Sequence, residues 1–327
     1  MKNENIILVT GSCGFIGSNL IEELLKNEDN IIIGIDNFNS YYDNNIKLSN
    51  LERNKNERFI NYNIDITDNE KITEIFDKHN INQVYHLAAQ AGVRYSIYNP
   101  KEVIKINILG FQNIIENIID HGIKKFIYAS SSSVYGDMEE REINDENNPC
   151  NDQKSPYAVT KKTNELMAQM YSSLYPEIQM SGLRFFTVYG PYMRPDLAIS
   201  KFTKAILDNE EIHIYGNGEQ ERDFTNVEDI VRIMITIMNS GKKWNHEIFN
   251  IGYGNSISIN EIIKIIKDYV NPNYNKIIKE DNAEGDVNKT LAVNSKIKNW
   301  FNEYPKIDIY EGIRKYINWY KNKKGSN

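Results

Sequence analysis

A tyrosine and a lysine four residues apart, Tyr157 and Lys161, form the pair of side chains best suited to acid–base chemistry. Residues at this spacing lie on one face of a helix, and the preceding Ser155-Pro156 is typical of a helix start. A phenol can remove a proton from an alcohol near neutral pH only if its pKa falls from about 10 toward 7, a shift of about 4 kcal/mol. A neighbouring ammonium favours that shift. The pair therefore predicts proton transfer at a hydroxyl group.

A run of hydroxyl side chains precedes this pair in the sequence. Residues 130–133 are four serines that follow a short apolar segment and lead into Val134-Tyr135-Gly136. A serine in this place can bridge a phenol and its substrate by hydrogen bonds. Tyrosine and lysine at this spacing are common by chance, and the alternative is a solvated helix face. The serine run and the glycine loop described next favour the catalytic interpretation.

Three glycines near the start of the chain predict a dinucleotide site. An apolar run at residues 6–9 leads into Gly11, Gly14 and Gly17, and an amphipathic stretch follows. In such a strand–turn–helix unit, glycines permit a tight turn, close approach of a pyrophosphate and close packing of helix on strand. The helix N-terminus offers free N–H groups to the phosphates. The cofactor contacts expected here are Gly11, Gly14, Phe15, Ile16 and Gly17.

The carboxylate that ends the second predicted strand indicates which dinucleotide binds. Asp36 and Asn37 lie about 20 residues beyond the glycines, where an acidic residue bonds the adenosine ribose of NAD. A carboxylate there repels the 2′-phosphate of NADP, so the sequence predicts NAD. Later strand ends supply further expected cofactor contacts, namely Asp65 and Ile66 at the adenine edge and Leu87, Ala88, Ala89 and Gln90 along the dinucleotide. His86 is expected to be packed and hydrogen-bonded rather than catalytic.

The elements that must position these residues alternate along the first half of the chain. Apolar runs predict strands at residues 6–9, 31–35, 59–62, 83–86, 126–129 and 180–183, and amphipathic stretches predict helices at 15–26, 71–78, 106–119 and 158–175. This alternation predicts an α/β fold with a doubly wound parallel sheet of the Rossmann type. Ligands of such sheets bind at the carboxyl ends of the strands, where the candidate residues lie.

The second half is less regular and predicts a smaller α+β substrate domain. Helices are expected at residues 202–207, 229–238 and 261–270, and a strand is expected at 248–251. We expect residues 1–182 to form the NAD-binding domain, with later returns near 224–252. Residues 183–223 and 253–327 are then expected to form the substrate domain.

The composition argues against several other classes of protein. The 327 residues carry a net charge of −7 that is spread along the sequence, so no basic face for nucleic acid is expected. Cys13 and Cys150 are too few for a disulfide framework, which favours a reducing compartment. The N-terminal apolar run is too short for a signal peptide or a membrane span. The histidines are scattered. We expect a cytoplasmic enzyme without a metal ion and without a membrane partner.

Taken together, these motifs resemble the extended short-chain dehydrogenase/reductase family, specifically its nucleotide-sugar epimerases. The resemblance covers nearly the whole chain and includes Arg222-Asp223-Phe224. Longer strings look like UDP-glucuronate 4-epimerases: Tyr41-Tyr42-Asp43 and residues 88–96 and 184–196. The resemblance implies that Tyr157 takes the O4 proton of a UDP-sugar while C4 gives its hydride to NAD⁺. The 4-keto sugar then turns and takes the hydride back on its other face. The implied reaction converts UDP-glucuronate to UDP-galacturonate, and the implied assembly is a homodimer.

The resemblance also implies roles for individual side chains. Ser131 is implied as the hydroxyl partner of Tyr157, and Lys161 completes the catalytic set. Implied substrate contacts are Arg94, Ser132, Ser133, Thr187, Arg194, Arg222 and Asp286. Thr187 and Arg194 match positions that hold the sugar carboxylate, for which the planar arginine fork is suited, and Arg222 matches a contact to the diphosphate or uridine. A surface role for Arg194 stays open, as do nucleotide contacts at Asp286, because residues 283–286 are more acidic than the family pattern.

The residues beside the serine run distinguish related reactions. Dehydratases of the family place Asp-Glu after the catalytic hydroxyl, and decarboxylating relatives place Glu before Val-Tyr-Gly. Here Ser132 and Ser133 stand in those positions, which favours epimerisation over dehydration or decarboxylation. The alternative is a 4-epimerase of UDP-glucose or a UDP-N-acetylhexosamine. A non-catalytic dinucleotide-binding protein has no need of Tyr157 and Lys161, so their presence counts against that interpretation.

Overall fold

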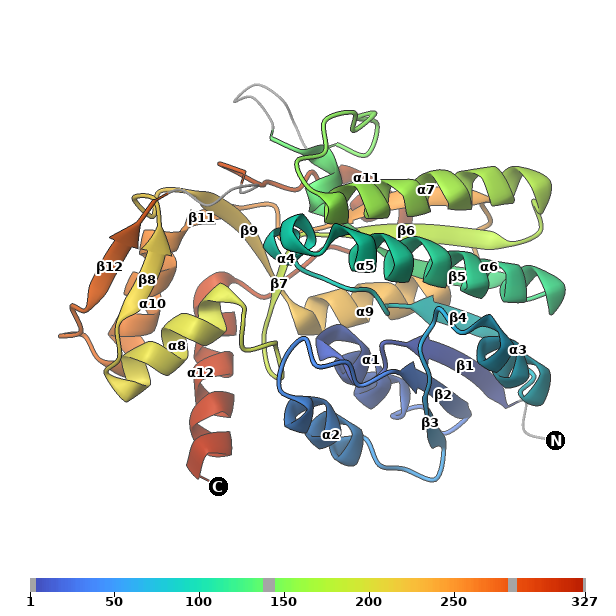
Figure 1. Ribbon diagram of the computed structural model, residues 1–327, viewed down its shortest axis with the longest axis horizontal. Coiled ribbons are helices and arrows are strands. Elements are labelled where there is room, and N and C mark those ends of the chain that lie inside the picture. Colours follow the sequence, from blue (N-terminus) through green and yellow to red (C-terminus); the bar gives the residue numbers. More distant parts are fainter. Residues whose placement is uncertain (1–3, 138–144, 282–286, 326–327) are drawn as a thin grey trace.

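A seven-stranded parallel sheet forms the centre of the molecule (Figure 1). The computed structural model describes residues 4–137, 145–281 and 287–325. The strand order is β10-β6-β5-β4-β1-β2-β3, and every pairing is parallel. The bounds are β1 (Asn5–Thr10), β2 (Asn30–Asp36), β3 (Phe59–Asn63), β4 (Gln83–His86), β5 (Lys125–Ser131), β6 (Gln179–Phe185) and β10 (His246–Ile251). The predicted α/β class with a Rossmann-type sheet is confirmed.

Helices cover both faces of this sheet. On one face lie α3 (Asn69–Lys78), α6 (Gly110–Asp120) and α7 (Pro156–Leu174), and on the other lie α1 (Phe15–Leu24), α9 (Val227–Met238) and α11 (Ser295–Phe301). Within β1, Ile7 and Val9 pack on the side of α1 and α9, whereas Leu8 packs on the side of α3 and α6. Because both faces are buried, the strands are continuous apolar runs in the sequence.

Among the described residues, five α-helices lie outside the elements predicted from the sequence. They are α2 (Asn44–Arg53), α4 (Val93–Tyr98), α5 (Pro100–Ile104), α11 (Ser295–Phe301) and α12 (Ile309–Gly325). The helix predicted at residues 106–119 begins instead as a π-helical turn, η1 (Lys105–Leu109), and continues as α6. Its buried Asn107 bonds to neighbouring segments, and π-helical turns of this kind are frequent at functional sites.

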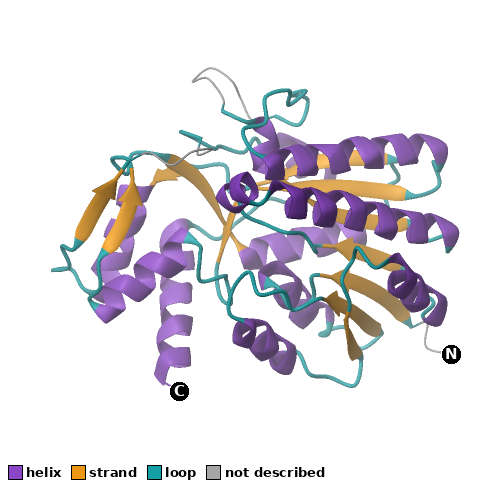
Figure 2. Ribbon diagram, in the orientation of Figure 1, coloured by secondary structure: helices purple, strands orange, loops and turns teal. Residues whose placement is uncertain are grey.

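A smaller group of elements lies beside the carboxyl ends of the parallel strands (Figure 2). One sheet contains β7 (Thr187–Tyr189), β9 (Glu221–Asn226) and β11 (Ser256–Ser258), and another contains β8 (Ile212–Tyr215) and β12 (Ile277–Glu280). The helices are α8 (Ala198–Asp208), α10 (Ile259–Val270) and α12 (Ile309–Gly325). Strand β6 continues past residue 182, where the first predicted domain ends, and the predicted division into two domains stays a proposal.

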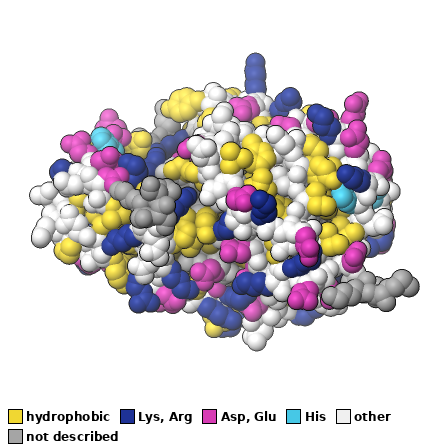
Figure 3. Space-filling model, turned by 90° about the horizontal axis from the view of Figure 1, so that it is seen from below, with side chains coloured by type: hydrophobic (Ala, Val, Ile, Leu, Met, Phe, Trp, Pro, Cys, Tyr) yellow, Lys and Arg dark blue, Asp and Glu magenta, His cyan; other side chains and the backbone are white. Residues whose placement is uncertain are grey.

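The surface carries charges of both signs. On the face shown in Figure 3, basic and acidic side chains are interspersed with hydrophobic ones. Within the described ranges, none of the helices has the length and apolar character needed to cross a membrane. Across the same residues, no cluster of His, Cys, Asp and Glu has the arrangement of a metal site.

Candidate active site

A cavity of about 720 Å³ lies at the carboxyl ends of the parallel strands, between the large sheet and the smaller elements. It brings together nearly all of the residues predicted from the sequence. The site residues predicted from the sequence that line this cavity are Gly11, Gly14, Phe15, Ile16, Gly17, Asp36, Asn37, Ile66, Leu87, Ala88, Ala89, Gln90, Arg94, Ser131, Ser132, Ser133, Tyr157, Lys161, Thr187, Arg194 and Arg222. Asp286 lies outside the described residues, and Asp65 does not line the cavity.

The glycine loop forms a cradle that only glycines permit. Gly11 has a φ of +69°, and a Cβ added there would lie 2.8 Å from the backbone nitrogen of Ala88. A Cβ on Gly17 would lie 2.1 Å from the carbonyl oxygen of Gly11. No side chain caps the N-terminus of α1 at Gly14, so its backbone N–H groups remain available to an anion. The cradle fits the pyrophosphate of a dinucleotide.

Asp36 lies at the far end of the cradle and is paired with a lysine. Its carboxylate accepts hydrogen bonds from the backbone N–H groups of Cys13 (3.2 Å) and Phe38 (2.9 Å). The ammonium of Lys47, a buried residue of α2, lies 3.3 Å from the same carboxylate and 2.9 Å from Asn39 Oδ1. The carboxylate is well placed for a ribose hydroxyl. Lys47 offsets its negative charge, so repulsion by Asp36 alone is an incomplete account of discrimination against a 2′-phosphate.

Asp65 supports the cavity from outside its lining. Its carboxylate accepts hydrogen bonds from the backbone and hydroxyl of Thr67, at 2.9 and 2.8 Å, and from Asn37 at 2.8 Å. Burial acts to raise the pKa of Asp65, but these hydrogen bonds outweigh it and hold the pKa below its usual value. The side chain therefore fixes Asn37, and its neighbour Ile66 reaches the cavity.

The predicted acid–base pair lies beside the serine run. Helix α7 begins where Ser155 accepts a hydrogen bond from the N–H of Ala158 at 3.2 Å. One turn further, Lys161 donates to the carbonyl of Ala129 at 2.8 Å, and its nitrogen lies 5.9 Å from the centre of the Tyr157 ring. Burial lowers the pKa of Lys161 to about 8. Lysine and tyrosine thus meet at the end of β5.

The phenol of Tyr157 has a hydrogen bond with Ser131. Burial raises the pKa of Tyr157, whereas the bond with Ser131 and the positive charge of Arg194 act in the opposite direction. Ser131 in turn lies 3.0 Å from the hydroxyl of Ser133. In the protein alone, burial therefore outweighs the effects that favour the phenolate of Tyr157. The reaction requires a lower pKa of this phenol, and further positive charge at the site would lower it.

A buried asparagine holds the catalytic helix against the strand-end segment 87–90. Asn107 of η1 accepts the N–H of Gln90 at 2.8 Å and donates to the carbonyl of Gln90 at 3.1 Å. It also donates to the hydroxyl of Thr160 at 3.0 Å, between the two members of the catalytic pair. One side chain therefore fixes both the segment along the expected dinucleotide and the helix that carries Tyr157.

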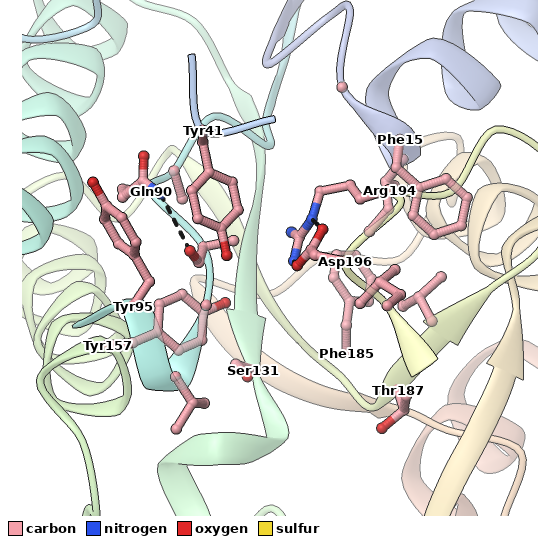
Figure 4. Close-up of a pocket in the computed structure, with 18 of the residues that line it drawn as sticks. Phe15, Tyr41, Gln90, Tyr95, Ser131, Tyr157, Phe185, Thr187, Arg194 and Asp196 are labelled. Carbon is pink, nitrogen blue, oxygen red and sulfur yellow. Dashed lines mark hydrogen bonds and ion pairs between the residues drawn. The ribbon is translucent and has the colours of Figure 1, made fainter. Parts of the chain in front are cut away.

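The opposite wall of the cavity carries an arginine–aspartate pair. Figure 4 shows Tyr41, Tyr95 and Tyr157 on one side and Arg194, Asp196 and Thr187 on the other. Arg194 donates from Nε and Nη2 to the two oxygens of Asp196, both at 2.9 Å. This bidentate pair orients the guanidinium, which lines the cavity, and the contact of Arg194 with the sugar carboxylate stays a prediction.

Two further arginines lie toward the smaller elements. The guanidinium carbon of Arg94, from α4, lies 3.9 Å from the centre of the Tyr215 ring in β8, so the two parts of the molecule meet there. Arg222 of β9 donates to the carbonyl oxygens of Glu221 at 2.8 Å and Asn288 at 3.3 Å. Both side chains line the cavity end that is remote from the glycine loop.

Several cavity residues were not assigned a role from the sequence. Tyr41, Lys47, Tyr95, Asp196 and Tyr215 all line the cavity. Tyr41, Tyr95 and Asp196 belong to the unusual strings that resemble epimerases, and that signal could have found them. Lys47 and Tyr215 had no such signal: Lys47 lies on the polar buried face of α2, and the partner of Tyr215, Arg94, lies far away in the sequence.

His86 and Cys13 have no direct chemistry in this arrangement. His86 is buried, its Nδ1 lies 2.8 Å from the hydroxyl of Thr10, and burial lowers its pKa to about 3. Burial and the nearby Asp36 raise the pKa of the Cys13 thiol to about 12. The expectation of a packed, hydrogen-bonded His86 agrees with this geometry.

Comparisons with known proteins agree with this geometry. Residues 7–252 match the model of the NAD dependent epimerase/dehydratase family. A UDP-glucuronate 4-epimerase of Thermodesulfobacterium geofontis is 41% identical, over 96% of this chain and 95% of its own. The crystal structure of a Bacillus cereus UDP-glucuronic acid 4-epimerase with UDP-glucuronic acid and NAD has a TM-score of 0.90 at 32% identity, covering 97% of this chain and 99% of that one.

A second solved structure is similar to nearly the same degree. It is the UDP-glucose 4-epimerase of Thermotoga maritima with UDP-glucose, with a TM-score of 0.88 at 30% identity, covering 98% of this chain and 99% of that chain. The family match spans most of the chain, from the glycine loop through the catalytic pair to β10. The chain therefore belongs to the NAD-dependent epimerase/dehydratase family.

Proposed function

We propose that this protein is an NAD-dependent UDP-sugar 4-epimerase that converts UDP-glucuronate to UDP-galacturonate. The observation that carries the proposal is the opposition of two groups across one cavity (Figure 4). Tyr157 and Ser131 lie on one side, and Arg194, a group that can hold a carboxylate, faces them from the other. The similarity to epimerases that act on UDP-glucuronate supports this substrate.

The protein's own residues divide the work of the reaction. Ser131 holds the sugar O4 and the phenol together, and Tyr157 removes the O4 proton and later returns it. Lys161, charged below about pH 8, favours the phenolate of Tyr157. NAD⁺, when bound in the glycine cradle, supplies the acceptor and donor for the C4 hydride. The cavity must also leave room for the 4-keto sugar to present its other face.

The sugar carboxylate needs a firm hold during this cycle. Oxidation at C4 of a glucuronate makes a β-keto acid, which loses CO₂ when its carboxylate bond aligns with the ketone π system. We assign Arg194 and Thr187 to keep that bond out of line, with a hydroxyl from Ser132 or Ser133. Arg94 and Arg222 are assigned to the nucleotide side of the substrate. No acidic residue stands beside Ser131, which matches epimerisation without elimination.

The neutral sugars remain a second candidate, favoured by one observation. The UDP-glucose 4-epimerase of Thermotoga maritima is similar to this chain to nearly the same degree as the Bacillus cereus UDP-glucuronic acid 4-epimerase. The test is incubation with UDP-glucuronate, UDP-glucose and UDP-N-acetylglucosamine, read by NMR. We expect UDP-galacturonate to form fastest, and Tyr157→Phe to retain NAD but show no turnover on any of them. A wild-type enzyme that prefers UDP-glucose would contradict the assignment of the substrate.

Replacing Arg194 tests the carboxylate contact directly. A charged hydrogen bond is worth about 1.5–3 kcal/mol, so Arg194→Ala should lower kcat/KM on UDP-glucuronate by roughly 10- to 150-fold. The loss on UDP-glucose should be much smaller because that sugar has no carboxylate. Equal losses on the two substrates would assign Arg194 to the nucleotide or to the fold.

We further propose a homodimer and a reducing, cytoplasmic location. Helix α7 exposes Val159, Leu166 and Met170 on one stripe, with 46%, 60% and 46% of each residue exposed. The adjacent α4 and α5 add Tyr98 and Ile104, which are 76% and 46% exposed. An apolar face on three neighbouring helices is suited to packing against the same face of a second copy. The location rests on Cys13 and Cys150, which are both free thiols.

A further inference from the structure

The guanidinium of Arg194 has one edge occupied within the protein. Nε and Nη2 are bound to the two oxygens of Asp196 in a fork-to-fork arrangement. An arginine has five N–H donors in one plane, so three of them, two on Nη1 and one on Nη2, remain for a ligand. These three form the end of the fork, and Figure 4 shows the guanidinium directed toward the middle of the cavity.

Tyr41 contacts this ion pair from the other side of the cavity. Burial raises the pKa of Tyr41, and the neighbouring carboxylate of Asp196 acts in the same direction. Its ring centre lies 5.5 Å from the guanidinium carbon of Arg194 and 4.9 Å from the ring centre of Tyr95. A Cβ on Gly92 would lie 2.6 Å from the Tyr41 hydroxyl, so the glycine is what lets this ring come so close.

We propose that Asp196, with Tyr41, is a positioning residue that sets the preference for an acidic sugar. Asp196 holds the plane and direction of the Arg194 fork, so that its free end meets the sugar carboxylate edge-on. This inference rests on the proposed function, because it concerns the contact that distinguishes glucuronate from glucose.

The charge balance explains why the Arg194–Asp196 pair selects a carboxylate. A lone buried arginine would attract any anion, including inorganic phosphate, through its net charge. Pairing with Asp196 removes most of that net charge and leaves directional donors. A planar carboxylate can use two of them at once, whereas a neutral hydroxymethyl group gains little from them. The pair therefore converts a general anion site into a carboxylate site.

The test compares Asp196→Asn with the wild-type holoenzyme on UDP-glucuronate and UDP-glucose. An amide can accept from only one of the two arginine N–H groups and presents its own N–H groups to the other, so the fork is released. We expect kcat/KM on UDP-glucuronate to fall roughly 10-fold, mainly through KM, and the loss on UDP-glucose to be at least five-fold smaller. Asp196→Glu, which keeps the carboxylate, should recover part of the loss.

Two further variants keep the test decisive. Tyr41→Phe removes only the hydroxyl that interacts with Asp196 and should shift the same substrate ratio in the same direction, even if Asp196→Asn folds poorly. Asp77→Asn, at a side chain that is 69% exposed on α3, is the matched control and should leave the ratio unchanged. Bound NAD and the thermal midpoint of unfolding report on folding.

The outcomes separate this inference from the proposed function. Equal losses on both substrates would make Asp196 merely structural, and tighter binding of UDP-glucuronate in Asp196→Asn would show that Asp196 competes with the substrate. Either result overturns the inference while the epimerase assignment stands. A wild-type enzyme inactive on UDP-glucuronate but active on UDP-glucose would overturn both.

Discussion

At the scale of single residues, neighbouring groups alter or balance the charges of the active-site side chains. Lys161 keeps a hydrogen bond to Ala129, yet burial lowers its pKa to about 8. Asp36 and Arg194 are each paired with an ion of opposite charge, Lys47 and Asp196. The reactivity and selectivity of these three groups therefore depend on neighbours as much as on their own side chains.

The lowered pKa of Lys161 makes stability depend on pH. Its pKa is about 10.5 in the unfolded chain and about 8 in the folded protein without cofactor. The folded state thus binds this proton less tightly, and the charged lysine costs stability below about pH 8, a cost relieved as the pH rises toward 10.5. Lys161→Met removes the buried ammonium and therefore this cost. We expect the difference in unfolding free energy between Lys161→Met and wild type to fall by about 3 kcal/mol between pH 7 and pH 11.

Urea unfolding of the cofactor-free proteins at the two pH values measures this difference. Lys124→Met, at a side chain that is 57% exposed, is the control and should show no comparable pH dependence. A difference for Lys161→Met that does not vary with pH would mean that the buried amine is not the source.

The pairing of Asp36 with Lys47 leads to a prediction about the cofactor. Asp36→Ala should weaken NAD retention because the ribose loses its carboxylate partner. It also leaves Lys47 buried without its counter-ion, so the ratio of NADP to NAD affinity should rise at least 10-fold. Titration with each dinucleotide measures the two affinities. In Asp36→Ala/Lys47→Met the gain should disappear, and a gain that persists there would rule out Lys47 as its cause.

At the scale of elements, the loop between β1 and α1 depends on the closeness of two backbones. A Cβ on Gly17 would lie 2.1 Å from the carbonyl oxygen of Gly11, a contact that neither backbone can relieve by moving a side chain. Gly17→Ala should therefore displace α1 from the loop, lower the thermal midpoint and release NAD on purification.

A glycine elsewhere provides the comparison for that variant. Nothing lies within 4 Å of a Cβ placed on Gly241, and its φ is not positive, so Gly241→Ala should keep its NAD and its thermal midpoint. The ratio of bound NAD to protein, read by absorbance, distinguishes the two. A Gly17→Ala protein that retains full NAD would show that the loop tolerates a wider separation.

At the scale of the whole molecule, the apolar stripe on α7 tests the proposed dimer. Leu166→Glu/Met170→Glu places two charges on the stripe and should give a monomer by sedimentation or light scattering, because like charges would face each other across a two-fold axis. Thr163, one turn before Leu166 on the same stripe, is a milder site, and Thr163→Ser should leave the assembly unchanged. A wild-type protein that is monomeric at micromolar concentration would contradict the dimer.

Features carried by consecutive residues were determined by the sequence alone. The glycine loop, the Tyr157 and Lys161 pair, the serine run and the parallel sheet depend on local spacing and on apolar runs, and the structure has the seven strands of the large sheet at the predicted places, whereas the strands of the two smaller sheets were not predicted. Hydrophobic periodicity did not predict helix α2, because the buried face of this helix is polar, with Lys47 and Asn50.

The pairings within the site were decided by the tertiary structure. Lys47 meets Asp36 because α2 folds back onto the end of β2, and Arg94 meets Tyr215 because the large sheet and the smaller elements bring distant segments together. Arg194 and Asp196 are neighbours in sequence, yet the direction of the fork depends on the cavity walls and on Tyr41. A sequence specifies which charged groups are available. The folded backbone decides which of them lie within a few ångströms, and since electrostatic and hydrogen-bond energies fall steeply with distance and with exposure to water, that decision sets the chemistry.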